Sequence, residues 1–166
     1  MPGSHTFKVL GIDPGSRVTG YGLVEKARCG LVWVTHGEIR PGRGTILLSQ
    51  CLETIYDRLH GLIEETGPDA MSIEDIFYGK NVKSLIRQGH VRGAAILAAK
   101  HLNIPVFEYN PLEIKKAVVG YGRAEKVQVQ MMIKAMLKLA EVPLPDAADA
   151  LAAAVCHIHF QKTEPV

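Results

Sequence analysis

The sequence has few cysteines and no pattern that would join them. Cys29, Cys51 and Cys156 are an odd number of widely spaced residues, and no Cys-x-x-Cys pair occurs. This arrangement argues against a disulfide framework and against a zinc site. We therefore expect three free thiols, buried or half-buried, in a protein of the reducing cytoplasm.

Long hydrophobic runs are also absent. No apolar stretch approaches the roughly 20 residues that a membrane-spanning helix needs, and the N-terminus lacks the layout of a signal peptide, so we expect no contact with a membrane. With 47% hydrophobic and 22% charged residues, the 166-residue chain is typical of one folded domain. We assign that domain to residues 1–166, with flexible ends at 1–6 and 161–166.

The hydrophobic pattern predicts a mixed α/β fold. Three closely spaced strands, which favour an antiparallel meander, are followed by a helix that Thr45 can cap and then by alternating strands and helices. The predicted strands cover residues 7–13, 21–25, 31–39, 70–73 and 105–109. The predicted helices cover residues 45–65, 81–102, 111–119, 124–139 and 147–160. This order predicts a mixed five-stranded sheet flanked by helices.

Four carboxylates stand at the ends of predicted elements. Asp13 ends the first strand, Glu74 follows the fourth, and Asp146 and Asp149 stand three apart where the last helix should begin. If the fold brings them together, each pair at about 5 Å repels by roughly 3 kcal/mol at an effective dielectric constant of about 20. A divalent cation bound by hard oxygen ligands, Mg²⁺ or Mn²⁺, would relieve that repulsion. The four acids are therefore candidate metal ligands and catalytic residues.

Each acid also has an ordinary interpretation. Asp13 precedes proline and glycine, which is a typical turn sequence, and Glu74 resembles an exposed residue that leaves a strand. Asp146 can cap the last helix, with Asp149 at its third position, and such a cap does not prevent both acids from binding a metal. The joint pattern, two acids at strand ends and two at a helix start, favours a two-metal centre for displacement at phosphorus.

Basic residues gather in the second half of the chain. Between Gly79 and Phe107 there are five basic residues and no acid, whereas the segment from Glu53 to Asp75 is rich in acids. A basic surface beside a carboxylate cluster suits a polyanion whose phosphates approach a metal. A solvated helix surface would explain the same charge pattern without any ligand.

Six segments, taken in order, resemble the bacterial RuvC family of Holliday-junction resolvases. They are GIDPGSxxTGYG at residues 11–22, IExxF at 73–77, FEY at 107–109, KxxVVG at 115–120, AEKxQV at 124–129 and DAADAL at 146–151. The start of the first segment recurs in other proteins of the ribonuclease-H-like class, but the six in this order are specific and span nearly the whole chain. The resemblance implies a ribonuclease-H-like fold.

The resemblance implies a crossover junction endodeoxyribonuclease that makes paired, symmetric nicks in four-way DNA during recombination and repair of DNA damage. It implies a homodimer and a requirement for Mg²⁺, with Mn²⁺ as a substitute and two ions in each active site. The resemblance also suggests the branch-migration complex of RuvA and RuvB as a partner. By resemblance, Asp13, Glu74, Asp146 and Asp149 bind the metals, although some members of the family carry histidine at the position of Asp146.

The resemblance also assigns contacts with DNA. Lys115 and Lys126 match lysines that contact DNA near the cut, and Lys126 could also steady charge that develops at the phosphate. Phe77 matches an aromatic residue that stacks on a junction base, an interaction worth about 1–3 kcal/mol. Nearby residues that we expect to contact DNA are Tyr78, Lys80, Lys83 and Arg87. Without the resemblance, a core ring at 77 and a solvated lysine at 126 would be the simpler explanations, and Asp75, where relatives can carry glutamine, has no assigned role.

Three other functions are compatible with parts of the sequence. A related ribonuclease-H-like nuclease could cut structured RNA, although the segment around Phe77 and the basic second half argue mildly against it. A non-catalytic junction-binding module would suit a degenerate centre, but all four acids are present. An actin-like ATPase shares the strand order, but the chain is short for the two lobes that grip a nucleotide.

Overall fold

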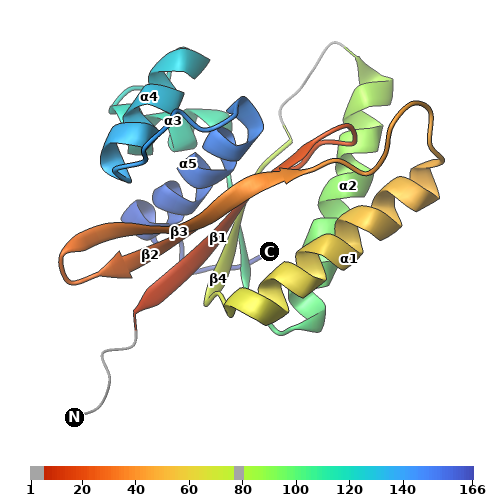
Figure 1. Cartoon of the computed structure of the whole chain (residues 1–166), viewed down its shortest axis with the longest axis horizontal. Helices are drawn as coiled ribbons and strands as arrows, with labels where there is room; N and C mark the ends of the chain where they lie inside the picture. The colour runs from red at the N-terminus through yellow and green to blue at the C-terminus, as the bar shows by residue number, and fades with distance from the viewer. Residues whose placement is uncertain (1–5, 77–80) are drawn as a thin grey trace.

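The computed structural model describes residues 6–76 and 81–166, and a five-stranded sheet lies between two layers of helices (Figure 1). The strands are β1 (Phe7–Asp13), β2 (Thr19–Ala27), β3 (Gly30–Ile39), β4 (Ala70–Glu74) and β5 (Val106–Tyr109). The helices are α1 (Leu48–Thr66), α2 (Val82–His101), α3 (Pro111–Val119), α4 (Lys126–Met136) and α5 (Pro145–Phe160). Strands and helices follow one another in the order that the sequence predicts.

The sheet is mixed, with strand order β3-β2-β1-β4-β5. Strands β1, β2 and β3 are antiparallel neighbours, whereas β4 runs parallel to both β1 and β5. This arrangement confirms the prediction of a mixed sheet whose first three strands are antiparallel. Because Ile12 of β1 lies opposite Ile73 of β4, the C-terminal ends of these two strands reach the same edge of the sheet.

Each face of the sheet has its own hydrophobic core. Helices α1 and α2 cover one face, while α5, backed by α3 and α4, covers the other (Figure 1). Successive residues of a strand point to opposite faces, so Val9 joins the core beneath α5 and Leu10 joins the core beneath α1 and α2. The sheet is therefore held rigidly from both sides, which gives its strand ends fixed positions.

Glycines in the first two strands let α5 lie close to the sheet. A side chain at Gly11 would collide with the carbonyl oxygen of Ala150, and one at Gly20 would collide with that of Asp146. On β4, the hydroxyl of Ser72 donates a buried hydrogen bond of 2.7 Å to the carbonyl oxygen of Ala153. Gly11 and Gly20 thus serve close helix packing, and they bring the first turn of α5 over the end of β1.

The boundaries of four helices differ from the prediction, by one residue at each end of α2, by two at the start of α5, and by more at α1 and α4. Helix α1 begins at Leu48, three residues after the predicted Thr45 cap, because the side chain of Gln50 accepts the Leu47 N–H at 3.2 Å. Helix α4 begins two residues later than predicted and ends three residues earlier. Its C-terminal end is followed by Lys138, which has a left-handed φ of 53° and cannot continue the helix.

The start of α5 corrects the prediction that Asp146 caps this helix. Leu144 occupies the cap position, Pro145 is the first helical residue, and Asp146 lies within the first turn. Proline suits the first helical position because the N–H that it lacks would have no partner inside the helix. The correction leaves both Asp146 and Asp149 on the helix itself, where their directions follow from helical geometry.

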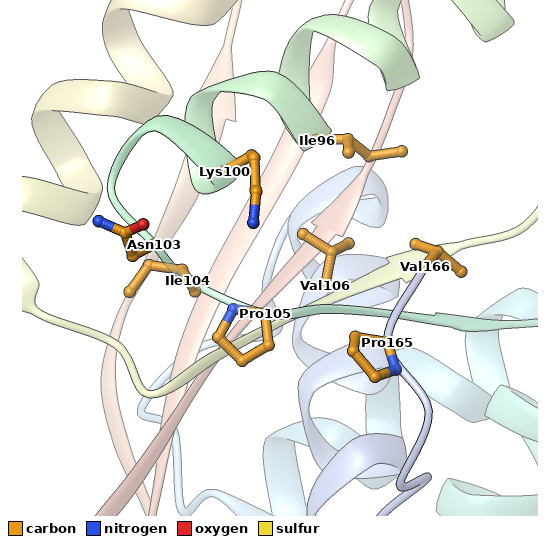
Figure 2. A pocket seen from close by; sticks show the side chains of 8 residues that line it. All are labelled: Ile96, Lys100, Asn103, Ile104, Pro105, Val106, Pro165 and Val166. Carbon is orange, nitrogen blue, oxygen red and sulfur yellow. The ribbon is translucent and has the colours of Figure 1, made fainter.

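The C-terminal segment returns to the edge of the sheet beside β5. The backbone N–H of Val166 donates a hydrogen bond of 2.9 Å to Val106. Pro165 and Val166 help to line a hollow of about 270 Å³ between this segment and the end of α2, as Figure 2 shows. The flexibility predicted for 1–6 and 161–166 stays a prediction, and residues 1–5 lie outside the described part of the chain.

All three cysteines are free. Cys51 and Cys156 are buried as predicted, but Cys29 is exposed, because it lies in the turn between β2 and β3, where no other element covers it. Within the described ranges, no helix combines the length and the apolar character needed to cross a bilayer.

Candidate active site

Four carboxylates from three separate parts of the chain meet in one cleft, which we call the acid cleft. It has a volume of about 390 Å³ and is lined by Asp13, Glu74, Asp146 and Asp149. Its other lining residues are Gln88, Pro111, Ile114, Lys115, Lys126 and Val129. The structure therefore brings together all four acids that the sequence singled out, with two of the predicted lysines beside them.

The convergence of the acids follows from the topology of the sheet. Asp13 and Glu74 are the last residues of β1 and β4, which are parallel neighbours. Asp146 and Asp149 stand three residues apart on α5, a spacing that places both side chains on one face of a helix. Because Gly20 lets the backbone at Asp146 rest against β2, that face meets the two strand ends.

Burial and neighbouring charge act together on Asp13. Burial contributes most, and the charges of Glu74, Asp149 and Asp146 add to it, so that the pKa of Asp13 rises from 3.8 to about 8. The charge of Lys126 acts in the opposite direction. Without a bound cation, burial and the neighbouring carboxylates therefore favour the protonated form of Asp13.

The pKa of Glu74 depends on Asp13 and on Lys126, and the pKa of Asp149 depends on Lys126. Burial and then Asp149 raise the pKa of Glu74, whereas a hydrogen bond with Asp13 lowers it. A protonated Asp13 that donates to an ionised Glu74 satisfies both carboxyl groups. Burial also raises the pKa of Asp149, and the chief opposing influence is Lys126, whose Nζ lies 3.4 Å from Asp149 Oδ2. In return, Asp149 raises the pKa of Lys126 and keeps that lysine charged.

The donor set of the acid cleft fits a hard divalent cation. Its four candidate ligands are all carboxylates, and the two lysines offset only part of their charge. Within residues 6–76 and 81–166, no three acidic, histidine or cysteine side chains already stand close enough to enclose a metal. The proton shared by Asp13 and Glu74 takes up part of the charge that a cation would neutralise. A cation that binds these carboxylates would displace this proton and draw the carboxylates together.

The predicted DNA-contacting residues fall into three groups. Lys115 and Lys126 line the acid cleft. Lys83 and Arg87 lie on the first two turns of α2 and line a different hollow. The remaining predicted contacts, Phe77, Tyr78 and Lys80, lie outside the described residues.

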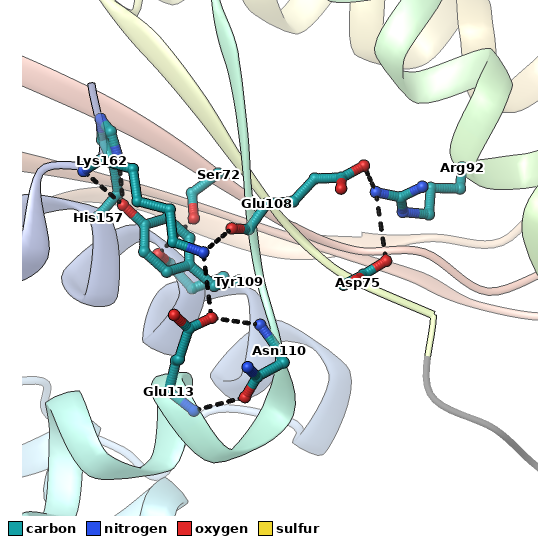
Figure 3. Close-up of polar contacts among 10 residues, drawn as sticks. Ser72, Asp75, Arg92, Glu108, Tyr109, Asn110, Glu113, His157 and Lys162 are labelled. Atoms are coloured by element: carbon teal, nitrogen blue, oxygen red, sulfur yellow. Dashed lines mark hydrogen bonds and ion pairs between the residues drawn. The ribbon is translucent and has the colours of Figure 1, made fainter. Parts of the chain in front are cut away.

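Sequence reasoning missed Arg92, which contacts the backbone of the acid cleft. Its Nε donates a hydrogen bond of 3.3 Å to the carbonyl oxygen of Glu74. Its guanidinium pairs with Asp75 at 3.8 Å and with Glu108 (Figure 3). Only 13% of the Arg92 side chain is exposed, so this arginine holds the end of β4 in place. It also gives Asp75, which had no assigned role, a structural partner.

Gln88 was also missed, although one signal in the sequence points to it. Gln88 stands four residues before Arg92 on α2, so the two side chains share a face of that helix. Ser84 lies one further turn along the same face and lines the hollow next to the acid cleft. A polar row at this spacing, in a helix that is otherwise rich in small residues, marks the side that faces the site.

The chain is similar to proteins of one family over nearly its whole length. The family model described as crossover junction endodeoxyribonuclease RuvC matches residues 9–157. RuvC of Syntrophotalea carbinolica is 48% identical over 152 residues, which are 92% of this chain and 94% of the relative. RuvC of Geobacter sulfurreducens is 49% identical over 150 residues, which are 90% of this chain and 91% of the relative.

A solved structure is similar over nearly the whole chain. Thermus thermophilus RuvC in complex with Holliday junction substrate superposes with a TM-score of 0.88 and 28% sequence identity. The match covers 96% of this chain and 99% of the T. thermophilus chain. The ribonuclease-H-like fold predicted by resemblance is therefore confirmed.

Proposed function

The chain belongs to the RuvC family of crossover junction endodeoxyribonucleases, and from this premise we propose that it resolves four-way DNA junctions by hydrolysing phosphodiester bonds in paired, symmetric nicks. Relatives that carry this name match at least nine-tenths of the chain, and the T. thermophilus relative was solved with a Holliday junction. Such an enzyme acts in recombination and DNA repair, in the cytoplasm that holds the bacterial chromosome.

The observation that carries this proposal is the convergence of four carboxylates in the acid cleft, whose charge two lysines offset only in part. Four half-buried carboxylates face one another there, and the pKa of Asp13 is raised to about 8. Perturbed carboxylates in a solvent-facing cleft are typical of catalytic sites. Buried charges that serve stability alone are normally paired.

Asp13, Glu74, Asp146 and Asp149 are the residues that would hold Mg²⁺, or Mn²⁺ in its place, with two ions in each site. When bound, such ions supply an activated water and stabilise the leaving oxygen in an in-line displacement. The carboxylates orient this chemistry from the rigid ends of β1 and β4 and from the first turns of α5.

The two lysines of the acid cleft have a separate task. Lys126 lies 3.4 Å from Asp149, and 72% of its side chain is exposed, so its charge is available to a phosphate that enters. We assign to it the stabilisation of negative charge that develops at phosphorus. Lys115 lines the same cleft and would contact the strand beside the cut. Stacking by Phe77, and DNA contacts by Tyr78 and Lys80, stay predictions.

Paired nicks require two active sites on one junction. The proposed enzyme is therefore a homodimer whose subunits cut opposite strands, and a branch-migration complex of RuvA and RuvB would move the junction to the preferred sequence. Sedimentation of the purified chain alone and with junction DNA would measure the stoichiometry. A single subunit bound to each junction would contradict the paired mechanism.

The decisive experiment compares three substrates of equal length: a synthetic mobile four-way junction, a linear duplex and a structured RNA. Each is incubated with the purified chain, with and without Mg²⁺, and the products are mapped to the nucleotide. We expect symmetric nicks in the junction only, and only with Mg²⁺. Faster cutting of RNA would favour a ribonuclease. Absence of nicks at every pH, with either Mg²⁺ or Mn²⁺, would leave a junction-binding module.

A further inference from the structure

The turn that follows Asp13 is held by the side chain of a threonine. Residues 14–18 form this turn between β1 and β2, and Thr19 is the first residue of β2. The Thr19 hydroxyl donates a hydrogen bond of 2.8 Å to the carbonyl oxygen of Gly15 and accepts the Gly15 N–H at 3.3 Å. One side chain therefore satisfies both backbone groups of a residue that stands two positions after Asp13.

The surroundings of Thr19 keep its hydroxyl in one direction. Thr19 is fully buried, so its hydroxyl and the groups bound to it depend on one another for hydrogen bonds. Threonine is branched at Cβ, which restricts its χ1 angle. The turn itself is tight, since a side chain at Gly15 would come within 2.3 Å of the carbonyl oxygen of Val18. The path of the chain after Asp13 is therefore closely tied to Thr19.

Helix α1 holds the next residue of the same turn. The buried thiol of Cys51 donates a hydrogen bond of 3.3 Å to the carbonyl oxygen of Ser16. Thr19 and Cys51 thus bind successive residues of the turn from β2 and from α1. Because a thiol is a weaker donor than a hydroxyl, we expect Thr19 to contribute more to the position of the turn.

The start of β2 supports two of the four carboxylates of the acid cleft. Gly20, which follows Thr19, lies opposite Asp13 in the antiparallel ladder. The same glycine rests against the backbone of Asp146, where an added side chain would come within 2.0 Å of the carbonyl oxygen. Residues 14–18 and Asp146 also line one hollow. A shift of this turn would therefore move the end of β1 relative to the first turn of α5.

We propose that Thr19 is a positioning residue of the acid cleft, whose hydroxyl fixes the turn after Asp13 and thereby directs the Asp13 carboxylate toward Glu74 and the start of α5. The inference rests on the proposed function and deepens it, since it names the group that keeps a candidate metal ligand in place. Thr19 is not among the described residues that line the acid cleft, so it acts through Asp13. Small displacements of reacting groups cost large factors in rate.

The test uses substitutions that separate the hydroxyl of Thr19 from its methyl group. Thr19→Val keeps the branched shape and loses the hydroxyl. Thr19→Ser keeps the hydroxyl and loses the methyl group, whereas Thr19→Ala loses both. The matched control is Thr66→Val, which removes a threonine hydroxyl that donates a 2.6 Å hydrogen bond to Leu62 at the end of α1, outside the lining of the acid cleft.

Cation binding and catalysis are measured separately in each variant. Calorimetric titration gives the affinity for Mg²⁺, and junction cleavage gives kcat and KM. We expect Thr19→Val and Thr19→Ala to lose about tenfold in Mg²⁺ affinity and about tenfold in kcat, while KM for the junction stays within about twofold of the wild type. Thr19→Ser and Thr66→Val should remain close to the wild type in all three quantities.

Hydrogen exchange of the Gly15 amide provides a measurement that needs neither metal nor DNA. In the wild type this N–H is bonded to the Thr19 hydroxyl, so we expect it to exchange slowly. In Thr19→Val and Thr19→Ala its exchange should accelerate on the order of tenfold, whereas amides in the middle of β1 should keep their wild-type rates. Thr19→Ser should preserve most of the protection of Gly15.

Three outcomes would overturn the inference. The first is wild-type Mg²⁺ affinity and kcat in folded Thr19→Val, even if its stability falls. The second is an equal loss in Thr19→Ser and Thr19→Ala, which would assign the effect to the methyl group. The third is failure of both Thr19→Val and Thr19→Ala to fold, which would make Thr19 a residue of the fold alone.

Failure of the proposed function would look different. In that case the wild-type chain would not nick a junction in the presence of Mg²⁺, whatever the variants do. The Mg²⁺ affinities and the exchange of the Gly15 amide would still decide whether Thr19 positions the acid cleft.

Discussion

Helix α5 carries polar side chains at both ends, but their surroundings differ. Carboxylates face other carboxylates at its start, whereas a histidine near its end has a hydrogen-bond partner. At its start, Asp146 and Asp149 face Asp13 and Glu74, with Lys126 as the nearest cation. Near its end, the buried His157 stacks on Phe107 with ring centroids 4.3 Å apart and shares a hydrogen bond of 2.8 Å with the hydroxyl of Tyr109.

The polar cluster around Tyr109 is matched group by group, as Figure 3 shows. The Tyr109 hydroxyl accepts the backbone N–H of Lys162 at 3.1 Å and so can donate to Nδ1 of His157. The Nζ of Lys162 reaches the carbonyl oxygen of Glu108 at 2.7 Å and the carboxylate of Glu113 at 3.2 Å. Every polar group named here has a partner, which is what burial demands of a cluster that only supports the fold.

The acid cleft, by contrast, keeps like charges together. Its repulsion lowers the stability of the cation-free protein and shifts the pKa of Asp13 to about 8. Such an arrangement persists where it serves a ligand or a reaction. The start of α5 therefore contributes to a site whose charge a cation would neutralise, whereas its end contributes to a polar cluster that supports the core.

Replacement of Asp13 should have the largest effect. Asp13→Asn keeps the size of the side chain and removes its charge, so we expect junction cleavage with Mg²⁺ to fall on the order of 1,000-fold or more, while junction binding survives. Single-turnover cleavage and a binding assay measure the two quantities. The control is Asp57→Asn, which removes an exposed carboxylate from α1. Wild-type cleavage by Asp13→Asn would remove the acid cleft from the mechanism.

Replacement of Lys126 should have the next largest effect. Lys126→Met keeps most of the length of the side chain and removes the cation nearest to Asp149, so we expect the cleavage rate at saturating junction to fall about 100-fold. Lys138→Met, at an exposed lysine outside the cleft, should cleave normally. If Lys126→Met lost affinity for the junction but kept its rate, the lysine would bind DNA without stabilising the reaction.

Arg92 offers a sharper test because it pairs with Glu108, next to Tyr109, and also contacts the backbone of the acid cleft. Arg92→Met removes the hydrogen bond to the carbonyl oxygen of Glu74 and leaves Asp75 and Glu108 without their cation. We expect about a tenfold loss of cleavage rate together with weaker Mg²⁺ binding, and partial recovery in Arg92→Lys. Calorimetric titration with Mg²⁺ provides the second measurement. A loss of stability with unchanged rate and Mg²⁺ affinity would make Arg92 purely structural.

Replacement of Tyr109 should affect stability alone. Tyr109→Phe leaves His157 and the N–H of Lys162 without their partner, so we expect the free energy of unfolding to fall by about 1–3 kcal/mol. Urea denaturation measures this change, and junction cleavage below the transition should match the wild type. Tyr121→Phe, at an exposed tyrosine, is the control and should change neither quantity. Lost cleavage in a folded Tyr109→Phe would contradict the division between the two ends of α5.

The smallest expected effect is the pH dependence of the free energy of unfolding, which should differ between the clusters at the two ends of α5. Burial lowers the pKa of His157 from 6.5 to about 4, so the unfolded chain takes up this proton more readily and stability falls as pH falls from about 6.5 to 4. The raised pKa of Asp13 acts oppositely: the folded state holds the proton more tightly, and stability falls as pH rises toward about 8.

Between pH 6.5 and 8 the contribution of His157 should be over, whereas that of Asp13 and the acids coupled to it should remain. In the absence of divalent ions, we expect the free energy of unfolding to fall across this window by on the order of 1 kcal/mol. The slope should vanish in Asp13→Asn, and saturating Mg²⁺ should reverse it because the cation displaces the proton. Denaturation curves at closely spaced pH values measure the slope. An identical slope in the wild type and in Asp13→Asn would assign the effect to another group.

Local rules explain why so much of the fold was predictable. Strand β1 and helix α3 have the predicted bounds, because alternation of side chains and the Asn110-Pro111 helix start act within a few residues. Two of the helix starts that were wrong, those of α1 and α4, depend on side-chain caps. Gln50 and Gln128 accept the N–H groups that fix the starts of α1 and α4, and glutamine is too common inside helices to signal a cap.

Apart from Lys115 and Lys126, which the family resemblance supplied, the site was predictable only where a residue stands at the end or start of an element. Asp13, Glu74, Asp146 and Asp149 stand at strand ends or a helix start, where functional groups gather, and the structure brings all four into one cleft. Arg92 and Gln88 lie in mid-helix, and Arg17 and Arg40, which line a hollow near the acid cleft, lie in loops. Their importance depends on which face of α2 meets the sheet, and on how far the segments after β1 and β3 reach toward that helix.

By itself, the sequence determined which residues form strands and helices and which carboxylates close them. Alternation, capping and turn preferences operate over a few residues and need no distant partner. Only the tertiary structure decided that these acids share one cleft and that a second, basic hollow adjoins it. The physical reason is that both depend on the order of strands in the sheet and on the close approach of α5 to Gly11 and Gly20, which join residues far apart along the chain.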